Sequence, residues 1–157
     1  MEPRANYIKL GGEGIKGMYA LEKFLHGVSV EQPLVHLVKL RASQVNGCAY
    51  CIDMHWKDLR ALGETEQRLY GLDAWEESPY YTPRERAALR WTEELTHISK
   101  THASEAAYAE LKGQFSEQEI VDLTFVISTI NAWNRLAIGF RSEPGKYISQ
   151  LKPRSGA

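Results

Sequence analysis

The 157-residue sequence lacks several features that would place it in a class at once. Its longest apolar run, near Leu123 to Ile130, is far shorter than the ~20 residues that span a bilayer. The N-terminus, MEPRANYIKLGGEG, lacks the basic-then-apolar pattern of a signal peptide. The formal net charge is −1, without the basic excess that nucleic acids or anionic membranes attract. We therefore expect a cytoplasmic protein with neither a nucleic-acid nor a membrane partner.

Cysteine is scarce as well: the chain contains only two, Cys48 and Cys51, both in the stretch NGCAYCIDMH. In the cytoplasm, glutathione and thioredoxin systems keep structural disulfides rare. A closely spaced pair therefore indicates redox or metal chemistry more often than a structural bridge. A third interpretation is that these are two small apolar residues that happen to be neighbours.

Alternating strand patterns are almost absent, whereas helix signals recur along the chain. The expected helices cover about 31–45, 48–63, 66–71, 83 to 97 or 100, 104–112 and 116–140. We expect an all-α, single-domain helical bundle of about six to seven helices. The last residues, KPRSGA, are expected to be loose.

Three helix starts carry the spacing of a capping box, in which a hydroxyl side chain is followed three residues later by Glu or Gln. The pairs are Ser29 with Gln32, Thr82 with Glu85, and Ser116 with Glu119. The helix that begins after Ser116 is apolar around almost its whole circumference, as expected of a helix buried in a core or between subunits.

On a helical wheel, Cys48, Cys51 and His55 lie within roughly 60° of one another. Asp53 and Lys57 lie on the opposite, solvent side. Cys48 is in the first turn, where free backbone N–H groups and the helix dipole favour a thiolate. Cys51 is one turn later, within reach of a disulfide, and His55 is placed to accept and return a proton.

A metal site is the competing interpretation of the same three residues. Cys48, Cys51 and His55 supply three ligands, but no second C-x-x-C or H-x-x-x-H completes a zinc site. Ligands from one helix also converge poorly on a tetrahedral ion. We therefore expect no bound metal, and the residues alone leave redox chemistry and buried apolar cysteines open.

The flanking residues favour redox chemistry. The stretch LVKLRASQVNGCAYCIDMHWKDLRALG resembles the core motif of the AhpD-like alkylhydroperoxidases, in the carboxymuconolactone decarboxylase superfamily. The later STINAWNRLAIGF resembles the helix that follows in that family. The resemblance covers roughly residues 20–141 and implies an AhpD-like helical domain there, with an N-terminal segment at 1–19 and a C-terminal tail at 142–157.

The resemblance also implies roles. Cys51 corresponds to the cysteine that attacks the peroxide, Cys48 to its resolving partner, and His55 to the proton-relay histidine. Trp133, on the last helix, is either core or pocket lining. The resemblance implies an external dithiol or protein reductant, a small hydroperoxide substrate, no bound cofactor such as flavin or haem, and a homo-oligomer, commonly a trimer or hexamer.

One position departs from the family pattern. The relay usually includes a glutamate twelve residues before the first cysteine, and here that position is His36. A histidine passes protons near neutral pH but cannot supply a carboxylate's negative charge to His55. We treat His36 as a fourth candidate site residue and expect activity with a shifted pH profile; alternatively, His36 is a tolerated helix residue and the relay is broken.

The function predicted from the sequence is therefore a cysteine-based hydroperoxide reductase, an antioxidant peroxidase. A related disulfide reductase and a redox switch that does not turn over remain alternatives, because they share the same thiol chemistry. Decarboxylation of a muconolactone, the other activity in the superfamily, does not rely on a C-x-x-C pair and is disfavoured.

Overall fold

The computed structural model describes residues 2–152. Within this part of the chain there are nine α-helices, one short 3₁₀ helix and no strand. The helices are α1 (Tyr7–Leu10), α2 (Gly12–Leu25), α3 (Gln32–Asn46), α4 (Ala49–Ala61), α5 (Glu66–Tyr70), η1 (Leu72–Ala74), α6 (Pro83–Thr96), α7 (Ile98–Thr101), α8 (Glu105–Lys112) and α9 (Glu117–Phe140). The all-α prediction is confirmed. The helix number exceeds the expected six to seven because α1 and α7 are separate single turns.

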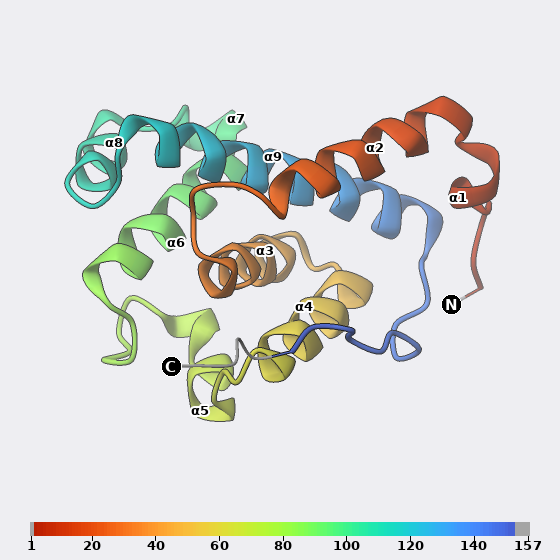
Figure 1. Cartoon of the computed structure of the whole chain (residues 1–157), viewed down its shortest axis with the longest axis horizontal. Helices are drawn as coiled ribbons and strands as arrows, with labels where there is room; N and C mark the ends of the chain where they lie inside the picture. Colours follow the sequence, from red (N-terminus) through yellow and green to blue (C-terminus); the bar gives the residue numbers. More distant parts are fainter. Residues whose placement is uncertain (1, 153–157) are drawn as a thin grey trace.

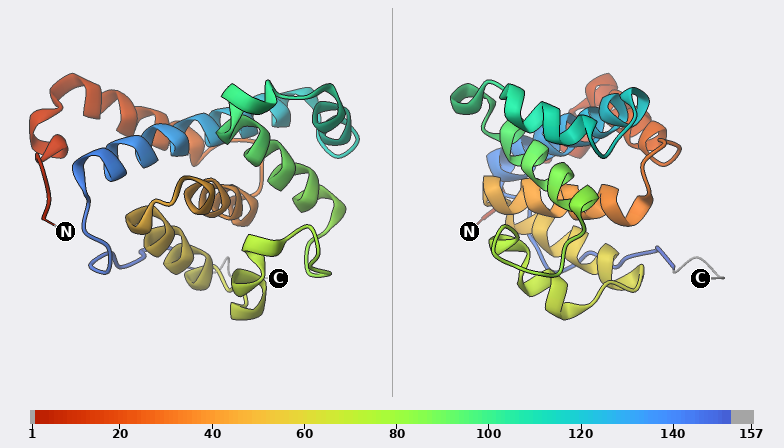
Figure 2. Two further views of the ribbon diagram at one scale, coloured as in Figure 1. Left: turned by 180° about the vertical axis from the view of Figure 1, so that it is seen from behind. Right: turned by 90° about the vertical axis from the view of Figure 1, so that its left-hand side faces the viewer.

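Helix α3 lies at the centre of the bundle (Figure 1). It packs against α4, α6 and α9, while α2 runs alongside α9 on one side of the molecule. The view from behind and the side view show the same arrangement, with α4 on the other side of α3 from α2 and α9 (Figure 2). Because α3 is covered on several sides, an unbroken run of nine-tenths-buried residues occupies its middle, including His36 and Lys39.

Two of the three predicted capping boxes are present. Thr82 with Glu85 begins α6, and Ser116 with Glu119 begins α9. The third, Ser29 with Gln32, was wrong: α3 is preceded by Glu31, which makes no side-chain cap. Ser29 instead contacts α9: its N–H and its hydroxyl donate hydrogen bonds to Asp122 at 2.8 and 2.7 Å. Asp122, which is distant in the sequence, thus takes the place of Gln32 as the partner of Ser29.

The turn between α3 and α4 positions the cysteine pair. Gly47 ends α3 with φ of 69°, a left-handed conformation that favours glycine. The Asn46 side chain donates to Asn131 and Asn134 of α9 at 3.0 and 2.8 Å. Asn134, fully buried, donates in turn to Ser43 at 3.1 Å. These amides fix the start of α4 against α9.

The C-terminal segment after α9 runs beside α4 (Figures 1 and 2). The Lys57 ammonium donates to the carbonyls of Gly145 and Tyr147, and Asp53 accepts from the N–H of Gly145. The face of α4 that was predicted to face solvent, with Asp53 and Lys57, is therefore in contact with the C-terminal segment. The looseness predicted for KPRSGA falls, beyond Lys152, on residues outside the described part of the chain.

No helix between residues 2 and 152 is both long enough and apolar enough to cross a bilayer. In α9 the apolar residues divide between two environments. Leu123, Ile127 and Ile130 are fully buried, whereas Val121 and Phe125 are about half exposed.

Candidate active site

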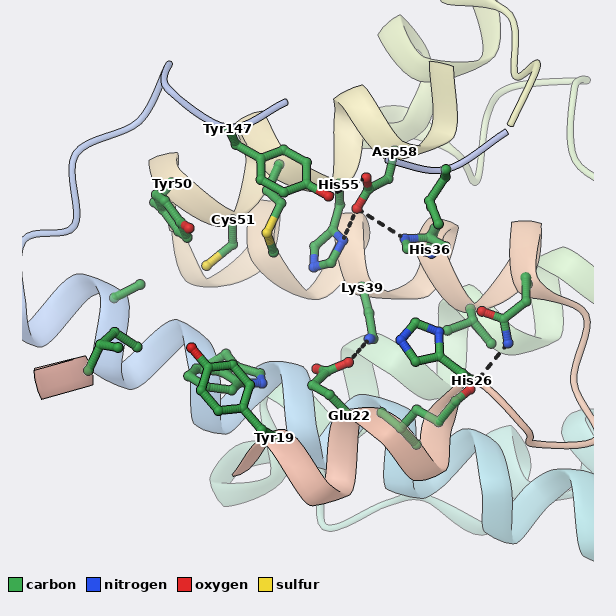
Figure 3. Close-up of a pocket in the computed structure, with 18 of the residues that line it drawn as sticks. Tyr19, Glu22, His26, His36, Lys39, Tyr50, Cys51, His55, Asp58 and Tyr147 are labelled. Carbon is green, nitrogen blue, oxygen red and sulfur yellow. Dashed lines mark hydrogen bonds and ion pairs between the residues drawn. The ribbon is translucent and has the colours of Figure 1, made fainter. Parts of the chain in front are cut away.

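The candidate site is a cavity of about 320 Å³ between α2 and α4. Cys51 and His55 line it from α4, and His36 lines it from α3 (Figure 3). Exposed Tyr19 and His26 belong to the same lining, so the cavity reaches solvent. Three of the four residues predicted from the sequence thus share one cavity.

The fourth, Cys48, lies behind Cys51. It is the residue immediately before α4, and its Sγ accepts the backbone N–H of Cys51 at 3.3 Å. The two cysteines form a disulfide, with their Cα atoms 5.3 Å apart. Both are almost fully buried, and only Cys51 contributes to the cavity lining. Any small molecule in the cavity therefore meets Cys51 before Cys48.

A carboxylate completes the cluster. Asp58, one turn after His55 on α4, places Oδ2 3.6 Å from Nδ1 of His55 and 3.6 Å from Nδ1 of His36 (Figure 3). All three side chains are buried. A carboxylate from α4 thus lies beside His55, although position 36 carries a histidine.

The other oxygen of Asp58 is held by the C-terminal segment. Tyr147 and Ser149 donate their hydroxyls to Oδ1 at 2.7 and 2.6 Å. Burial raises the pKa of Asp58, but His55 and these two hydroxyls outweigh that effect and hold the pKa at about 2. Asp58 is therefore an anion at any physiological pH.

Burial disfavours the charged form of both histidines. Burial, reinforced by the neighbouring His55 imidazole, lowers the pKa of His36 to about 3. Burial also lowers the pKa of His55, although the Asp58 carboxylate opposes the change. The expectation that neighbouring imidazoles disfavour each other's protonation is supported for His36, whose pKa the His55 imidazole helps to lower.

The opposite wall carries a buried ion pair. Lys39 of α3 donates to Glu22 of α2 at 2.7 Å, and its side chain is only 6% exposed (Figure 3). Trp133 lines the cavity beside Tyr19, their ring centroids 5.7 Å apart. The pocket-lining alternative for Trp133 is thus the one that the structure supports.

Sequence reasoning missed Asp58, Lys39 and Tyr147. Asp58 follows His55 by three residues, so helical spacing alone could have identified it as a neighbour. Lys39 follows His36 at the same spacing, but its partner Glu22 is on another helix and leaves no local signal. Tyr147 comes from the segment predicted as a tail, and only the fold brings it to Asp58.

The metal-ligand set considered from the sequence, Cys48, Cys51 and His55, is not available while the cysteines form a disulfide. Within residues 2–152 the structure instead groups His36, His55 and Asp58, whose ligand atoms all lie within 4.8 Å of one another.

The comparisons with known proteins agree with the fold. The carboxymuconolactone decarboxylase family profile matches residues 17–94. The uncharacterized protein YdfG of Bacillus subtilis is 42% identical over 138 residues, which are 88% of this chain and 94% of that protein. The chain belongs to the carboxymuconolactone decarboxylase superfamily, as an AhpD-like member.

Solved structures extend the comparison. A protein of unknown function from Agrobacterium tumefaciens, proposed to be the antioxidant defence protein AhpD, has a TM-score of 0.90 and 44% identity, covering 93% of this chain and all of the other. An uncharacterized peroxidase-related protein from Silicibacter sp. has a TM-score of 0.77 at 22% identity, covering 88% and 74% of the two chains. The second likeness, at this low identity, concerns the fold alone.

Proposed function

We propose that this protein is a thiol-dependent peroxidase that reduces small hydroperoxides with the Cys48–Cys51 pair. The observation that carries the proposal is the shared cavity: Cys51 faces it, His55 lies one turn away, and Asp58 is held beside His55 by two hydroxyls. An AhpD-like fold with a relative proposed for antioxidant defence supports the same chemistry.

The first step forms a sulfur–oxygen bond. His55 accepts the proton of the Cys51 thiol, and the thiolate attacks the distal oxygen of ROOH. The O–O bond breaks, Cys51 becomes a sulfenic acid, and the alkoxide leaves as ROH after taking the proton back from His55. The sulfur is oxidised by two electrons and the peroxide is reduced by two.

The second step forms the disulfide. The Cys48 thiol, whose ionisation is favoured by its position at the start of α4, gives up its proton and its sulfur attacks Sγ of Cys51; the S–O bond breaks, and the hydroxide takes up that proton and leaves as water. An external dithiol then reduces the disulfide by thiol exchange and is itself oxidised to a disulfide. The cycle converts ROOH and a dithiol into ROH, water and a disulfide, and it needs neither a metal nor a bound cofactor.

Asp58 is assigned the positioning role that the family gives to a glutamate. Its negative charge orients the His55 imidazole and stabilises the cation that forms when His55 takes a proton. His36, neutral and 3.6 Å from the same carboxylate, acts as a second neighbour of Asp58 and is not a substitute for the missing acid. A protein or small-molecule dithiol is the proposed reductant.

The test is steady-state consumption of hydrogen peroxide and of an organic hydroperoxide with a dithiol in excess. Wild-type protein is expected to turn over, and both Cys51→Ser and Cys48→Ser are expected to lose sustained turnover. Absence of turnover by the wild type, together with ready formation of the Cys48–Cys51 disulfide, would contradict the proposal and favour a disulfide reductase or a redox switch.

A further inference from the structure

Three buried nitrogen atoms in the cavity have no hydrogen-bond partner among the described residues. They are Nδ1 of His36 and both Nδ1 and Nε2 of His55, whose side chains are at most 9% exposed. Buried side-chain nitrogens are nearly always paired, because an unpaired polar group loses its hydration without compensation. The Nδ1 atoms of both imidazoles lie 3.6 Å from the same carboxylate oxygen, which is longer than a normal hydrogen bond and leaves both nitrogens available to a further ligand.

The spacing of these atoms fits a metal ion. Zinc binds imidazole nitrogen and carboxylate oxygen at about 2.0–2.1 Å, so tetrahedral ligands lie roughly 3.4 Å apart. The two distances from Asp58 Oδ2 to Nδ1 of His36 and of His55 are both 3.6 Å. The ligand atoms of all three residues lie within 4.8 Å of one another, so a small closing movement brings them onto one ion.

The surroundings also suit a cation. Tyr147 and Ser149 donate to Oδ1 of Asp58, which leaves Oδ2 directed at the histidines; hydrogen bonds to a ligating carboxylate orient it in the same way in metal sites. The Lys39 ammonium lies near the site and its charge opposes a cation there, and the Glu22 carboxylate, 2.7 Å from it, offsets part of that effect. The ligands come from two helices and all three line the cavity, so a water molecule in the cavity can reach an ion bound by them.

We propose that His36, His55 and Asp58 form a binding site for a divalent transition-metal ion of the zinc class, with water in the open position. Two histidines and one carboxylate are a donor set that suits zinc and its first-row neighbours and disfavours magnesium or calcium. The site uses neither cysteine as a ligand, shares His55 with the proposed peroxidase chemistry, and gives the histidine at position 36 a role.

A consequence for activity rests on the proposed function. A metal ion bound to His55 occupies a nitrogen lone pair and the Asp58 carboxylate, so His55 no longer serves Cys51. Zinc then switches off peroxide reduction while the thiols remain intact. Metal binding is measured without any reference to turnover. A failure of the metal-site proposal can therefore be distinguished from a failure of the proposed peroxidase activity.

The test is isothermal titration of tag-free, metal-stripped protein in the disulfide form with zinc chloride, because disulfide sulfur is a poor zinc ligand. The double variant Cys48→Ser, Cys51→Ser is titrated in parallel to remove any thiol contribution. One zinc ion per chain is expected in both proteins. His36→Gln and Asp58→Asn are expected to bind at least tenfold more weakly, and His97→Gln, which changes an exposed histidine, is expected to bind as wild type does.

Circular dichroism establishes that each variant is folded.

A second measurement needs only the wild-type protein. Cobalt(II) added to the disulfide form is expected to give the visible absorption of a four- or five-coordinate site of nitrogen and oxygen ligands. Excess zinc is expected to displace the cobalt and remove this absorption. Lack of stoichiometric zinc binding to the disulfide form, or binding that neither His36→Gln nor Asp58→Asn weakens, would overturn the proposal.

Discussion

At the scale of single residues, the main feature is that one carboxylate serves two histidines. Asp58 lies at equal distance from His36 and His55 and stays ionised because Tyr147 and Ser149 donate to its other oxygen. A change at Asp58 therefore acts on His55 without touching either cysteine. This separates the proposed proton relay from the thiol chemistry.

Asp58→Asn is expected to lower the rate of peroxide reduction by about tenfold to a hundredfold, because general acid–base help depends on the orientation and charge state of His55. Loss of the carboxylate removes the effect that raises the pKa of His55, so the acid limb of the pH profile moves to lower pH. Single-turnover rates at several pH values measure this. Asp73→Asn, in an exposed carboxylate, is the matched control; equal loss in both variants would contradict the role of Asp58.

His36 makes the stability depend on pH. Its pKa is about 3 in the folded protein, against an ordinary value of 6.5, so the unfolded chain binds the extra proton between these values. Stability is thus complete above about pH 6.5 and falls as the pH decreases, by roughly 2 kcal/mol at pH 5 from this residue.

His36→Gln is expected to reduce this loss, although burial of His55 still contributes in the same direction. Urea unfolding of metal-free protein at pH 7 and pH 5, with a chelator present, measures the difference. Exposed His97→Gln is the control. The same decrease in unfolding free energy for wild type and His36→Gln would show that His36 is not the titrating group.

At the scale of elements, the turn between α3 and α4 carries the cysteines and depends on α9. Asn134 is fully buried and links Asn46 to Ser43 across these helices. Asn134→Ala is expected to reduce the free energy of unfolding by about 2 kcal/mol, because it leaves both partners with an unmade hydrogen bond in the interior. Urea unfolding measures this free energy. As the control, Gln114→Ala changes an exposed side chain and is expected to leave the free energy of unfolding within about 0.5 kcal/mol of the wild-type value.

The elements themselves follow closely from local sequence. Thr82 with Glu85 and Ser116 with Glu119 predict two helix starts because cap and partner are three residues apart. Ser29 misleads because its strongest acceptor, Asp122, is 93 residues away. The site likewise has a part that local sequence predicts and a part that it does not. The spacing on α4 brings Cys51 and His55 together. The contact of Tyr147 with Asp58, in contrast, depends on the path of the chain after α9.

At the scale of the whole molecule, a small group of apolar side chains on α2 and α9 is left partly exposed. Phe24 of α2 and Phe125 of α9 stack edge to face at 5.9 Å between ring centroids, and both are about half exposed, as is Val121 one turn earlier. Apolar side chains that cluster on a surface are candidates for a contact with another subunit. The homo-oligomer expected from the family resemblance stays a prediction, and we place its contact here.

Phe125→Glu is expected to dissociate that oligomer, because burying an unpaired carboxylate in an apolar interface is costly. Sedimentation velocity measures the mass of wild type and variant, and Phe115→Leu, a substitution in the core, is the control that retains the surface. Wild-type protein that sediments as a 17.8 kDa monomer would contradict the assignment.

The most direct test of the central claim is chemical trapping of the oxidised cysteine in Cys48→Ser. The reduced variant is mixed with one equivalent of hydroperoxide and a sulfenic-acid reagent, and the modified peptide is identified by mass spectrometry. Because Cys51 faces the cavity and lacks its resolving partner in this variant, we predict one stable adduct, on Cys51. A thiol at Cys51 that survives peroxide unmodified would contradict the account.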